Sequence, residues 1–314
     1  MSTHPHNFTR RPIGRRCAHR PALWAAVLLV LSAVGCQSIG GRGAVSEKVA
    51  NCRYFTQKGV EASDRDDWAG AQSWLRRAVE SCPIDIDARR YYGESLWRNG
   101  ARVEAAAQLE HAIRLNPRDP LLHVRAGEMY LALGQSTRAA DKAKDVLRID
   151  PSHADGWALR ARINAADGQT RAALADYHRA LGYSPDQPGL LLELAELYIR
   201  TGEPQRALST LQQLVDTYAP DEVPQRAYYV QGLAFASLER FDDAADSHRA
   251  AARCGPADAE ILYRLAEAEM LAHRPQAARW AAHDALSVEP RHEPSRRLLA
   301  RIELASRAPE GRGL

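Results

Sequence analysis

The chain has 314 residues, of which 45% are hydrophobic and 26% charged, an ordinary globular composition that argues against intrinsic disorder. The net charge of +3 comes from the N-terminal segment, because five arginines and no acidic residue precede Cys36, and the remainder holds 37 basic and 39 acidic residues. Phosphate contacts need a surplus of positive charge, so we expect no nucleic-acid partner.

Residues 1–35 have the three parts of a secretion signal: a basic segment, an apolar run from Ala22 to Gly35, and small residues at its end. The apolar run has 14 residues, fewer than the roughly 20 that a membrane-spanning helix needs. The sequence therefore predicts a signal peptide over residues 1–35.

The segment Ala33-Val34-Gly35-Cys36 resembles the lipobox of bacterial lipoproteins, although Ala33 stands where that family usually has leucine. The resemblance implies that Cys36 is acylated and becomes the new N-terminus. By the same resemblance Gln37 implies an outer-membrane location facing the periplasm. The alternative is an uncleaved signal anchor in which Cys36 is an incidental thiol. Both alternatives place the rest of the chain outside the cytoplasm, and we expect residues 36–51 to form a flexible tether.

The body of the chain is periodic. Pro83, Pro117, Pro151 and Pro185 are 34 residues apart, and so are Pro256 and Pro290. A fixed set precedes each proline: a Gly or Ala, an Ala twelve residues later, and a larger residue four places further on in most windows. The small residues allow two antiparallel helices to approach closely, and proline ends the second helix.

This pattern resembles the tetratricopeptide repeat (TPR) family over about residues 52–292. The resemblance implies an all-α fold, a right-handed superhelix of about seven helix-turn-helix repeats. Each unit leaves an apolar side that only a neighbouring repeat can cover. The predicted repeats are 52–85, 86–119, 120–153, 154–187, 188–221, 225–258 and 259–292.

The register slips once, at Asp221–Pro224, where we expect a longer inter-repeat loop, with a hinge as the alternative. Residues 293–305 are predicted to form a capping helix, with Leu298, Ile302 and Ala305 covering the last repeat and three arginines facing water. We expect residues 306–314 to form a disordered tail.

No catalytic or phosphate-binding motif is present, and the histidines are scattered, so we expect no enzyme activity, metal site, cofactor or small-molecule substrate. Cys52 opens the first repeat and Cys82 closes its second helix, so their thiols are expected to be neighbours. A disulfide between them is one hypothesis, and two free thiols are the other.

In proteins of the family that this chain resembles, the first helices of the repeats line a concave groove that holds a protein partner. The residues that the spacing places there include four glutamates among aromatic and aliphatic side chains, which suggests a partner with basic and apolar groups. Alternatively, the glutamates only solvate this face and the tyrosines pack between repeats. The candidate groove residues are Arg90, Glu94, Trp97, Glu128, Arg162, Leu192, Glu196, Tyr229, Tyr263 and Glu267.

The sequence thus favours a membrane-anchored adaptor that binds a protein in the cell envelope and assists assembly of a pilus, secretion or wall-remodelling complex. A self-associating structural subunit of an envelope complex is the alternative. An enzyme would need an active site without a recognisable motif.

Overall fold

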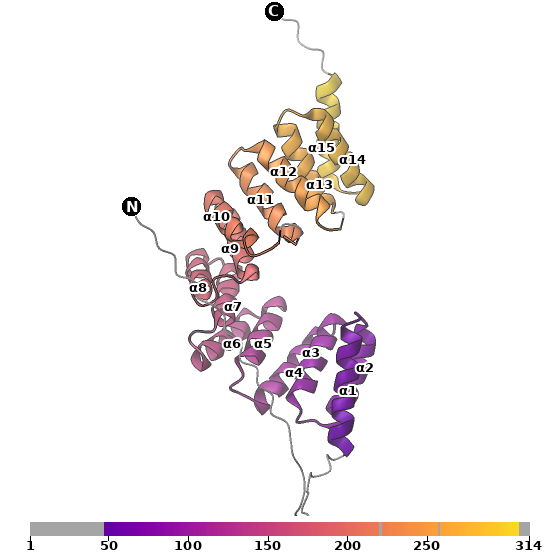
Figure 1. Cartoon of the computed structure of the whole chain (residues 1–314), viewed down its shortest axis with the longest axis vertical. Coiled ribbons are helices and arrows are strands. Elements are labelled where there is room, and N and C mark those ends of the chain that lie inside the picture. Colours follow the sequence, from indigo (N-terminus) through magenta and orange to yellow (C-terminus); the bar gives the residue numbers. More distant parts are fainter. Residues whose placement is uncertain (1–46, 220–221, 257, 308–314) are drawn as a thin grey trace, which may run out of the picture. The chain divides into compact units, whose positions relative to one another are not determined.

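The computed structural model describes residues 47–219, 222–256 and 258–307, and within these ranges it contains fifteen α-helices and no β-strand (Figure 1). The predicted signal peptide, residues 36–46 of the predicted tether and residues 308–314 of the predicted tail lie outside the described residues. The first eight helices are α1 (Glu47–Ser63), α2 (Trp68–Ser81), α3 (Ile86–Arg98), α4 (Arg102–Leu115), α5 (Pro120–Ala132), α6 (Ser136–Ile149), α7 (Ala154–Ala166) and α8 (Thr170–Tyr183). The others are α9 (Pro188–Arg200), α10 (Pro204–Val215), α11 (Gln225–Ser237), α12 (Phe241–Arg253), α13 (Ala259–Leu271), α14 (Pro275–Val288) and α15 (Glu293–Arg307).

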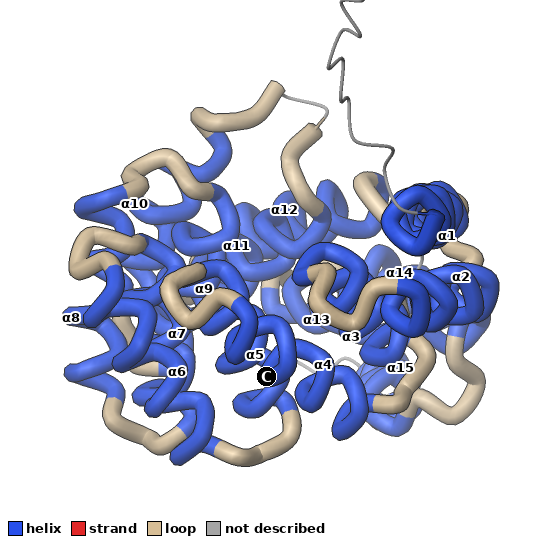
Figure 2. Tube along the Cα trace, turned by 90° about the horizontal axis from the view of Figure 1, so that it is seen from below, coloured by secondary structure: helices blue, strands red, loops and turns tan. Residues whose placement is uncertain are grey.

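The helices are arranged as a stack of helical hairpins, the α-solenoid that the repeat predicted. Each odd-numbered helix from α1 to α13 packs against the even-numbered helix that follows it, and that helix packs against the next hairpin (Figure 2). Six odd-numbered helices, α3 to α13, begin at the first residues of the repeats counted from the sequence. The first begins earlier: α1 starts at Glu47, so residues 47–51 are helical and do not belong to the tether as predicted.

The odd-numbered helices form the inner layer of the stack. Helix α1 also contacts α3, α5 contacts α7, α9 contacts α11 and α13 contacts α15. Among the described residues, no pair of even-numbered helices makes contacts of similar extent. The first helices of neighbouring repeats are therefore closer together than the second helices, which places the predicted groove residues on the inner side.

The small residues of the repeat allow this close packing. The alanines of the repeated column are fully buried in all seven hairpins: Ala71, Ala105, Ala139, Ala173, Ala207, Ala244 and Ala278. A Cβ atom placed on Gly93 would lie 2.4 Å from Cδ2 of Leu109. At this position only glycine lets helix α4 approach α3 so closely.

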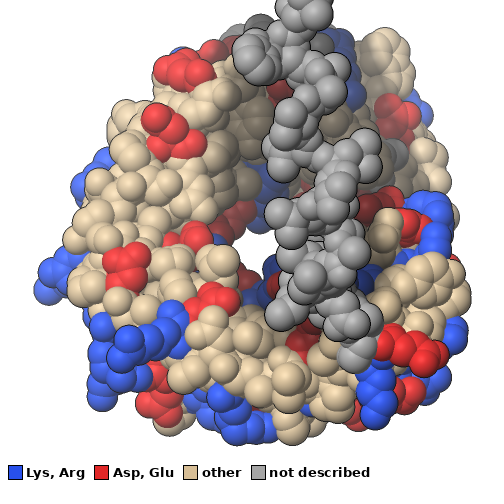
Figure 3. Space-filling view, turned by 60° about the horizontal axis from the view of Figure 1, so that its bottom comes forward, with Lys and Arg blue, Asp and Glu red and all other residues tan. Residues whose placement is uncertain are grey.

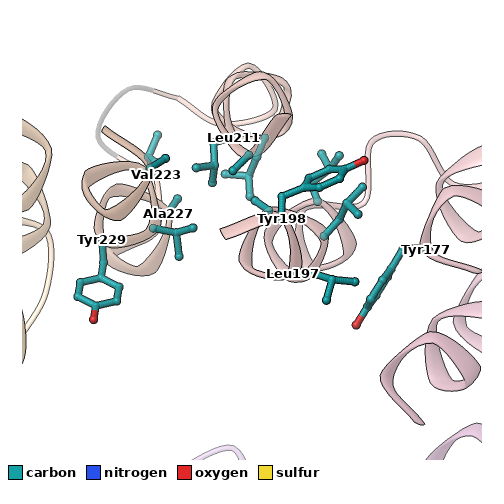
Figure 4. Close-up of a cluster of buried hydrophobic side chains, with 14 of the residues drawn as sticks. Tyr177, Leu197, Tyr198, Leu211, Val223, Ala227 and Tyr229 are labelled. Atoms are coloured by element: carbon teal, nitrogen blue, oxygen red, sulfur yellow. The ribbon is translucent and has the colours of Figure 1, made fainter. Parts of the chain in front are cut away.

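Between α9 and α11 a larger cluster joins two hairpins across the register slip (Figure 4). Val223, from the segment that interrupts the period, is 3% exposed and packs in the same cluster as Leu211 and Ala227. A buried side chain in this segment favours the longer-loop interpretation over a hinge.

Helix α15 covers the last hairpin. Leu298 and Ile302 are buried against α13 and α14, while Arg296, Arg297 and Arg301 are exposed. The helix extends to Arg307, two residues into the predicted tail. In the part of the chain that the structure describes, no helix combines the length and the hydrophobicity needed to cross a membrane.

Candidate functional site

Two adjacent hollows lie along the inner layer, and together they define the central groove. The first, of about 590 Å³, is lined by Trp97, Arg125, Glu128, Leu131, Ala132, Arg162 and Glu193. The second, of about 330 Å³, is lined by Arg162, Ala165, Ala166, Tyr177, Glu193, Glu196 and Arg200. The two hollows share Arg162 and Glu193, so the central groove runs over three consecutive first helices, α5, α7 and α9, with α3 at one edge.

Charged side chains of alternating sign connect these helices. Arg125 of α5 binds Glu94 of α3 at 2.7 Å and Glu128 of its own helix at 3.0 Å. Arg162 of α7 then reaches back to Glu128 at 3.0 Å and forward to Glu193 of α9 at 2.8 Å. The result is a charge ladder, Glu94–Arg125–Glu128–Arg162–Glu193, in which each arginine links neighbouring repeats. Figure 3 shows acidic and basic side chains interspersed over one face of the molecule, with both kinds around its central hollow.

The charges of the ladder are held in place. Burial tends to lower the pKa of Arg125, but Glu94 and Glu128 outweigh burial and raise it. The same balance between burial and the carboxylates of Glu193 and Glu128 raises the pKa of Arg162. Both guanidinium groups therefore keep their positive charge next to these carboxylates.

Apolar and neutral polar groups complete the groove. Trp97 is half-buried and lies beside the guanidinium groups of Arg102 and Arg125, 5.5 Å and 5.9 Å from the ring centroid. The hydroxyl of Tyr177 donates a 2.9 Å hydrogen bond to Glu193, and its pKa is raised by burial and then by that carboxylate. Tyr177 and Tyr229 direct their hydroxyl groups to the same side of their cluster (Figure 4). The groove thus offers an indole face and hydrogen-bonding groups with little net charge.

The predicted glutamates are on the inner helices, but each has a basic partner. Besides Glu94 and Glu128 in the ladder, Glu196 pairs with Arg226 at 2.7 Å and Glu267 with Arg264 at 3.0 Å. Arginines of the same or a neighbouring repeat thus compensate the charge of these glutamates. A partner of this surface does not need a basic charge.

The remaining predicted groove residues differ in accessibility. Tyr229 is buried in one cluster with Leu194 and Leu197 of the preceding repeat, so the alternative of packing between repeats applies to it. Its ring also lies 5.7 Å from the imidazole of His248. Tyr263 is half-buried against His292 and donates to Glu267 at 3.0 Å. Leu192 packs at the edge of the buried cluster around α9, and Arg90 pairs with Asp87 outside the central groove.

Sequence reasoning missed Arg125, Glu193 and Arg200 as groove residues. Arg125 and Glu193 both stand two places before the Gly or Ala column, at Gly127 and Ala195. Across the seven repeats that position is charged three times, at Arg125, Glu193 and Arg264, so the sequence held only a partial signal for these groove residues.

The cysteine pair of the first hairpin lies at the end of the stack. Cys52 and Cys82 are free thiols in this structure, and their sulfur atoms and a carboxylate oxygen of Asp85 all lie within 4.8 Å of one another. This is the single grouping of three potential metal ligands among the described residues. Asp85 also accepts a 2.8 Å hydrogen bond from the Ala88 N–H as the cap of α3, so its carboxylate already has a structural role. Cys36, the predicted lipid attachment site, lies outside the described residues.

The protein is an α-solenoid of helical hairpins, and paired charges and apolar side chains line its inner surface. Models of the tetratricopeptide repeat match residues 56–120, 96–163 and 164–228, so together they span more than half of the chain. The chain belongs to the tetratricopeptide repeat family.

Similar proteins agree with this assignment. Anaphase-promoting complex subunit 7 of Arabidopsis thaliana is 26% identical over 62% of this chain and 34% of its own length. The chain spans less than half the length of the curated relatives that it matches. A tetratricopeptide repeat protein of Parabacteroides merdae has the same fold, with a TM-score of 0.59 at 15% identity over 81% of this chain and 99% of its own. YrrB, described as a TPR protein with an unusual peptide-binding site, has a TM-score of 0.50 at 18% identity over 60% of this chain and 96% of its own.

Proposed function

We propose that this protein is a non-catalytic adaptor that is attached to a membrane through acylated Cys36 and binds a protein partner in the central groove. The proposed location is the cell envelope, with the repeats facing the periplasm from the outer membrane. There the adaptor would assist assembly of a pilus, secretion or wall-remodelling complex. The proposal assigns no cofactor and no small-molecule substrate to the chain.

The observation that carries the proposal is the central groove itself. Trp97 and Leu131 present apolar surface beside paired charges, a combination typical of protein-binding surfaces. An extended segment of a partner could place apolar side chains against Trp97 and Leu131. Its main chain could then bond to Arg200 or to lone pairs of the ladder carboxylates. The peptide-binding site named for YrrB, which has the same fold, supports this kind of partner.

Site-specific photocrosslinking in living cells tests the groove. A photoreactive residue would replace Leu131 in the groove, and the control would carry it at Lys144, an exposed position on α6 of the outer layer. We expect one envelope protein to be crosslinked from position 131 and not from position 144. The same proteins captured from both positions would contradict the assignment of the groove.

The captured partner then allows a quantitative test with purified proteins. Trp97→Ala should weaken the complex at least tenfold, because aromatic residues in the centre of an interface carry much of the binding energy. Trp280→Ala, which removes an indole that is 69% exposed on α14, should leave the affinity unchanged. Equal affinities for wild type and Trp97→Ala would place the binding surface elsewhere.

Attachment at Cys36 is tested separately from partner binding. Metabolic labelling with a fatty acid should mark the wild-type protein and not Cys36→Ser, and the mature protein should begin at Cys36. An unlabelled protein that keeps residues 1–35 would support the uncleaved signal anchor instead. Concentration-dependent sedimentation of the purified protein, without a partner, would support the self-associating structural subunit.

A further inference from the structure

The first hairpin carries an aromatic cluster formed by side chains of α1 and α2. The rings of Phe55 and Trp74 stack with centroids 5.9 Å apart, and Tyr54 meets Trp74 edge-on at 6.3 Å. The guanidinium of Arg77 lies over both stacked rings, 4.1 Å from Phe55 and 4.8 Å from Trp74. Tyr54 is 52% exposed and Phe55 and Trp74 are half-buried. We call Tyr54, Phe55, Trp74 and the neighbouring arginines 53, 76 and 77 the aromatic face.

The arginines of the aromatic face differ from those of the central groove. Within the part of the chain that the structure describes, Arg53, Arg76 and Arg77 make no ion pair with a carboxylate, whereas Arg125 and Arg162 each pair with two. The surrounding half-hairpin, residues 47–58 and 74–81, holds five basic and two acidic residues. The rest of residues 47–314 holds 31 basic and 37 acidic residues. Lys58, one of these five, pairs with Glu61, and residues 59–73 between the two segments add one basic and four acidic residues. The positive charge that remains without a carboxylate partner near the aromatic rings is therefore that of Arg53, Arg76 and Arg77.

The aromatic face belongs to the first hairpin, which is the part of the repeat array nearest to Cys36 in the sequence. Ten residues, 37–46, separate Cys36 from the start of α1. An extended chain covers at most about 3.5 Å per residue, so Glu47 can lie at most roughly 40 Å from Cys36. A protein acylated at Cys36 would keep its first hairpin near the lipid surface.

We propose that the aromatic face binds anionic phospholipid headgroups. Tryptophan and tyrosine are enriched at the headgroup level of membranes, and arginine is attracted to phosphate there. The contact would orient the repeat array on the bilayer, which an acyl chain at Cys36 alone does not do. This proposal builds on the attachment at Cys36 but does not require the acyl chain for its test.

The test uses the chain from residue 36 onward with Cys36→Ser, which has no acyl group, and vesicles of phosphatidylcholine with or without phosphatidylglycerol. We expect cosedimentation with the vesicles that contain phosphatidylglycerol, weakened by salt. The triple variant Arg53→Gln, Arg76→Gln, Arg77→Gln should lower the affinity roughly hundredfold, since each basic residue near an anionic surface contributes about fivefold. Trp74→Phe should abolish any shift in tryptophan emission that the vesicles cause.

The matched control removes the same charge from the other end of the array, with Arg296→Gln, Arg297→Gln and Arg301→Gln on α15. This control should bind the vesicles as wild type does. Absence of binding to phosphatidylglycerol, or an equal loss in the control, would overturn the proposal. So would a dimer that Trp74→Ala dissociates, because the aromatic face would then bind a second copy. The vesicle test does not depend on acylation, so a failure to label Cys36 would contradict the lipid attachment but not the binding of the aromatic face to phospholipid.

Discussion

Arg162 on α7 donates two hydrogen bonds of 2.8 Å to the carboxylate of Glu193 on α9. A further nitrogen of the same guanidinium donates to Glu128 on α5 at 3.0 Å. One side chain thereby joins three consecutive repeats. Bidentate arginine–carboxylate pairs are strong and geometrically specific, so this contact fixes how the three first helices are spaced along the groove.

We expect Arg162→Ala to lower the free energy of unfolding by about 1–3 kcal/mol, because it leaves the carboxylates of Glu128 and Glu193 partly buried without a partner. Urea unfolding followed by circular dichroism measures the change, and hydrogen exchange should locate the loosened amides in α5, α7 and α9. The control is Arg148→Ala, whose side chain is 71% exposed and pairs with Asp145 on the outer layer. An exposed pair contributes little, so a loss as large as that of Arg162→Ala would contradict the structural role of the ladder.

The sequence predicted the repeat array because packing of helical hairpins depends on local, periodic requirements. Small residues must recur where two helices approach, and these appear as columns in the chain. Ala105 and its equivalents are fully buried in all seven hairpins, as the period required. Two buried apolar residues of the capping helix, Leu298 and Ile302, could be predicted for the same reason, from their spacing on one face.

The groove was only partly predictable, since its charges pair between repeats. The spacing placed Glu94, Glu128 and Arg162 on the inner side, but their partners Arg125 and Glu193 lie in different repeats. Which charged side chains meet depends on the rotation from one hairpin to the next, and the sequence of a single repeat does not determine that rotation. Burial of Tyr229 depends likewise on the preceding repeat, since Tyr229 packs in one cluster with Leu194 and Leu197 of α9.

The glycine column gives a test of the close helix approach. Gly93→Ala would place Cβ 2.4 Å from Cδ2 of Leu109 and 3.2 Å from the carbonyl oxygen of Ala105, so we expect a loss of about 1–3 kcal/mol in the free energy of unfolding. Leu109→Ala should relieve part of this strain, which makes the double variant less unstable than the sum of the single changes.

Gly182→Ala serves as the matched control. A Cβ at this exposed position of α8 meets nothing within 4 Å, so alanine should stabilise the helix by roughly 0.5–1 kcal/mol. Chemical denaturation of wild type and the four variants under the same conditions gives the comparison. Equal effects at positions 93 and 182 would show that helix propensity, and not the contact with Leu109, governs the column.

His248 predicts a specific pH dependence. It is 1% exposed beneath Gly232, and burial, with a smaller contribution from Arg264, lowers its pKa to about 4. The ordinary pKa of histidine is about 6.5, so between pH 6.5 and pH 4 the unfolded chain takes up a proton that the folded chain does not. The free energy of unfolding must therefore fall as the pH falls through this window, by an amount on the order of 3 kcal/mol.

The variant His248→Leu isolates this contribution, because Leu75 and Leu109 occupy the same place beneath Gly59 and Gly93. We expect the difference in unfolding free energy between His248→Leu and wild type to grow from pH 7 to pH 4. Carboxylates titrate in both proteins and cancel in that difference. A difference that stays constant with pH would mean that folding does not change the pKa of His248.

The cysteine pair provides the last prediction. The pKa of Cys52 is raised to about 11 by burial, by Asp85 and by Cys82, so its reduced thiol should react slowly with alkylating reagents near pH 8. Cys254 is exposed and should react readily.

In protein isolated from an oxidising compartment, we expect a non-reducing peptide map to contain one peptide that links Cys52 and Cys82. In the chain-entropy view the bond would raise the free energy of unfolding by about 3 kcal/mol, and Cys82→Ser would lose that increment while Cys254→Ser would not. If both cysteines are alkylated after denaturation without reductant, the two thiols are free, which is the alternative hypothesis. Wild type should then also lack the stabilisation of about 3 kcal/mol.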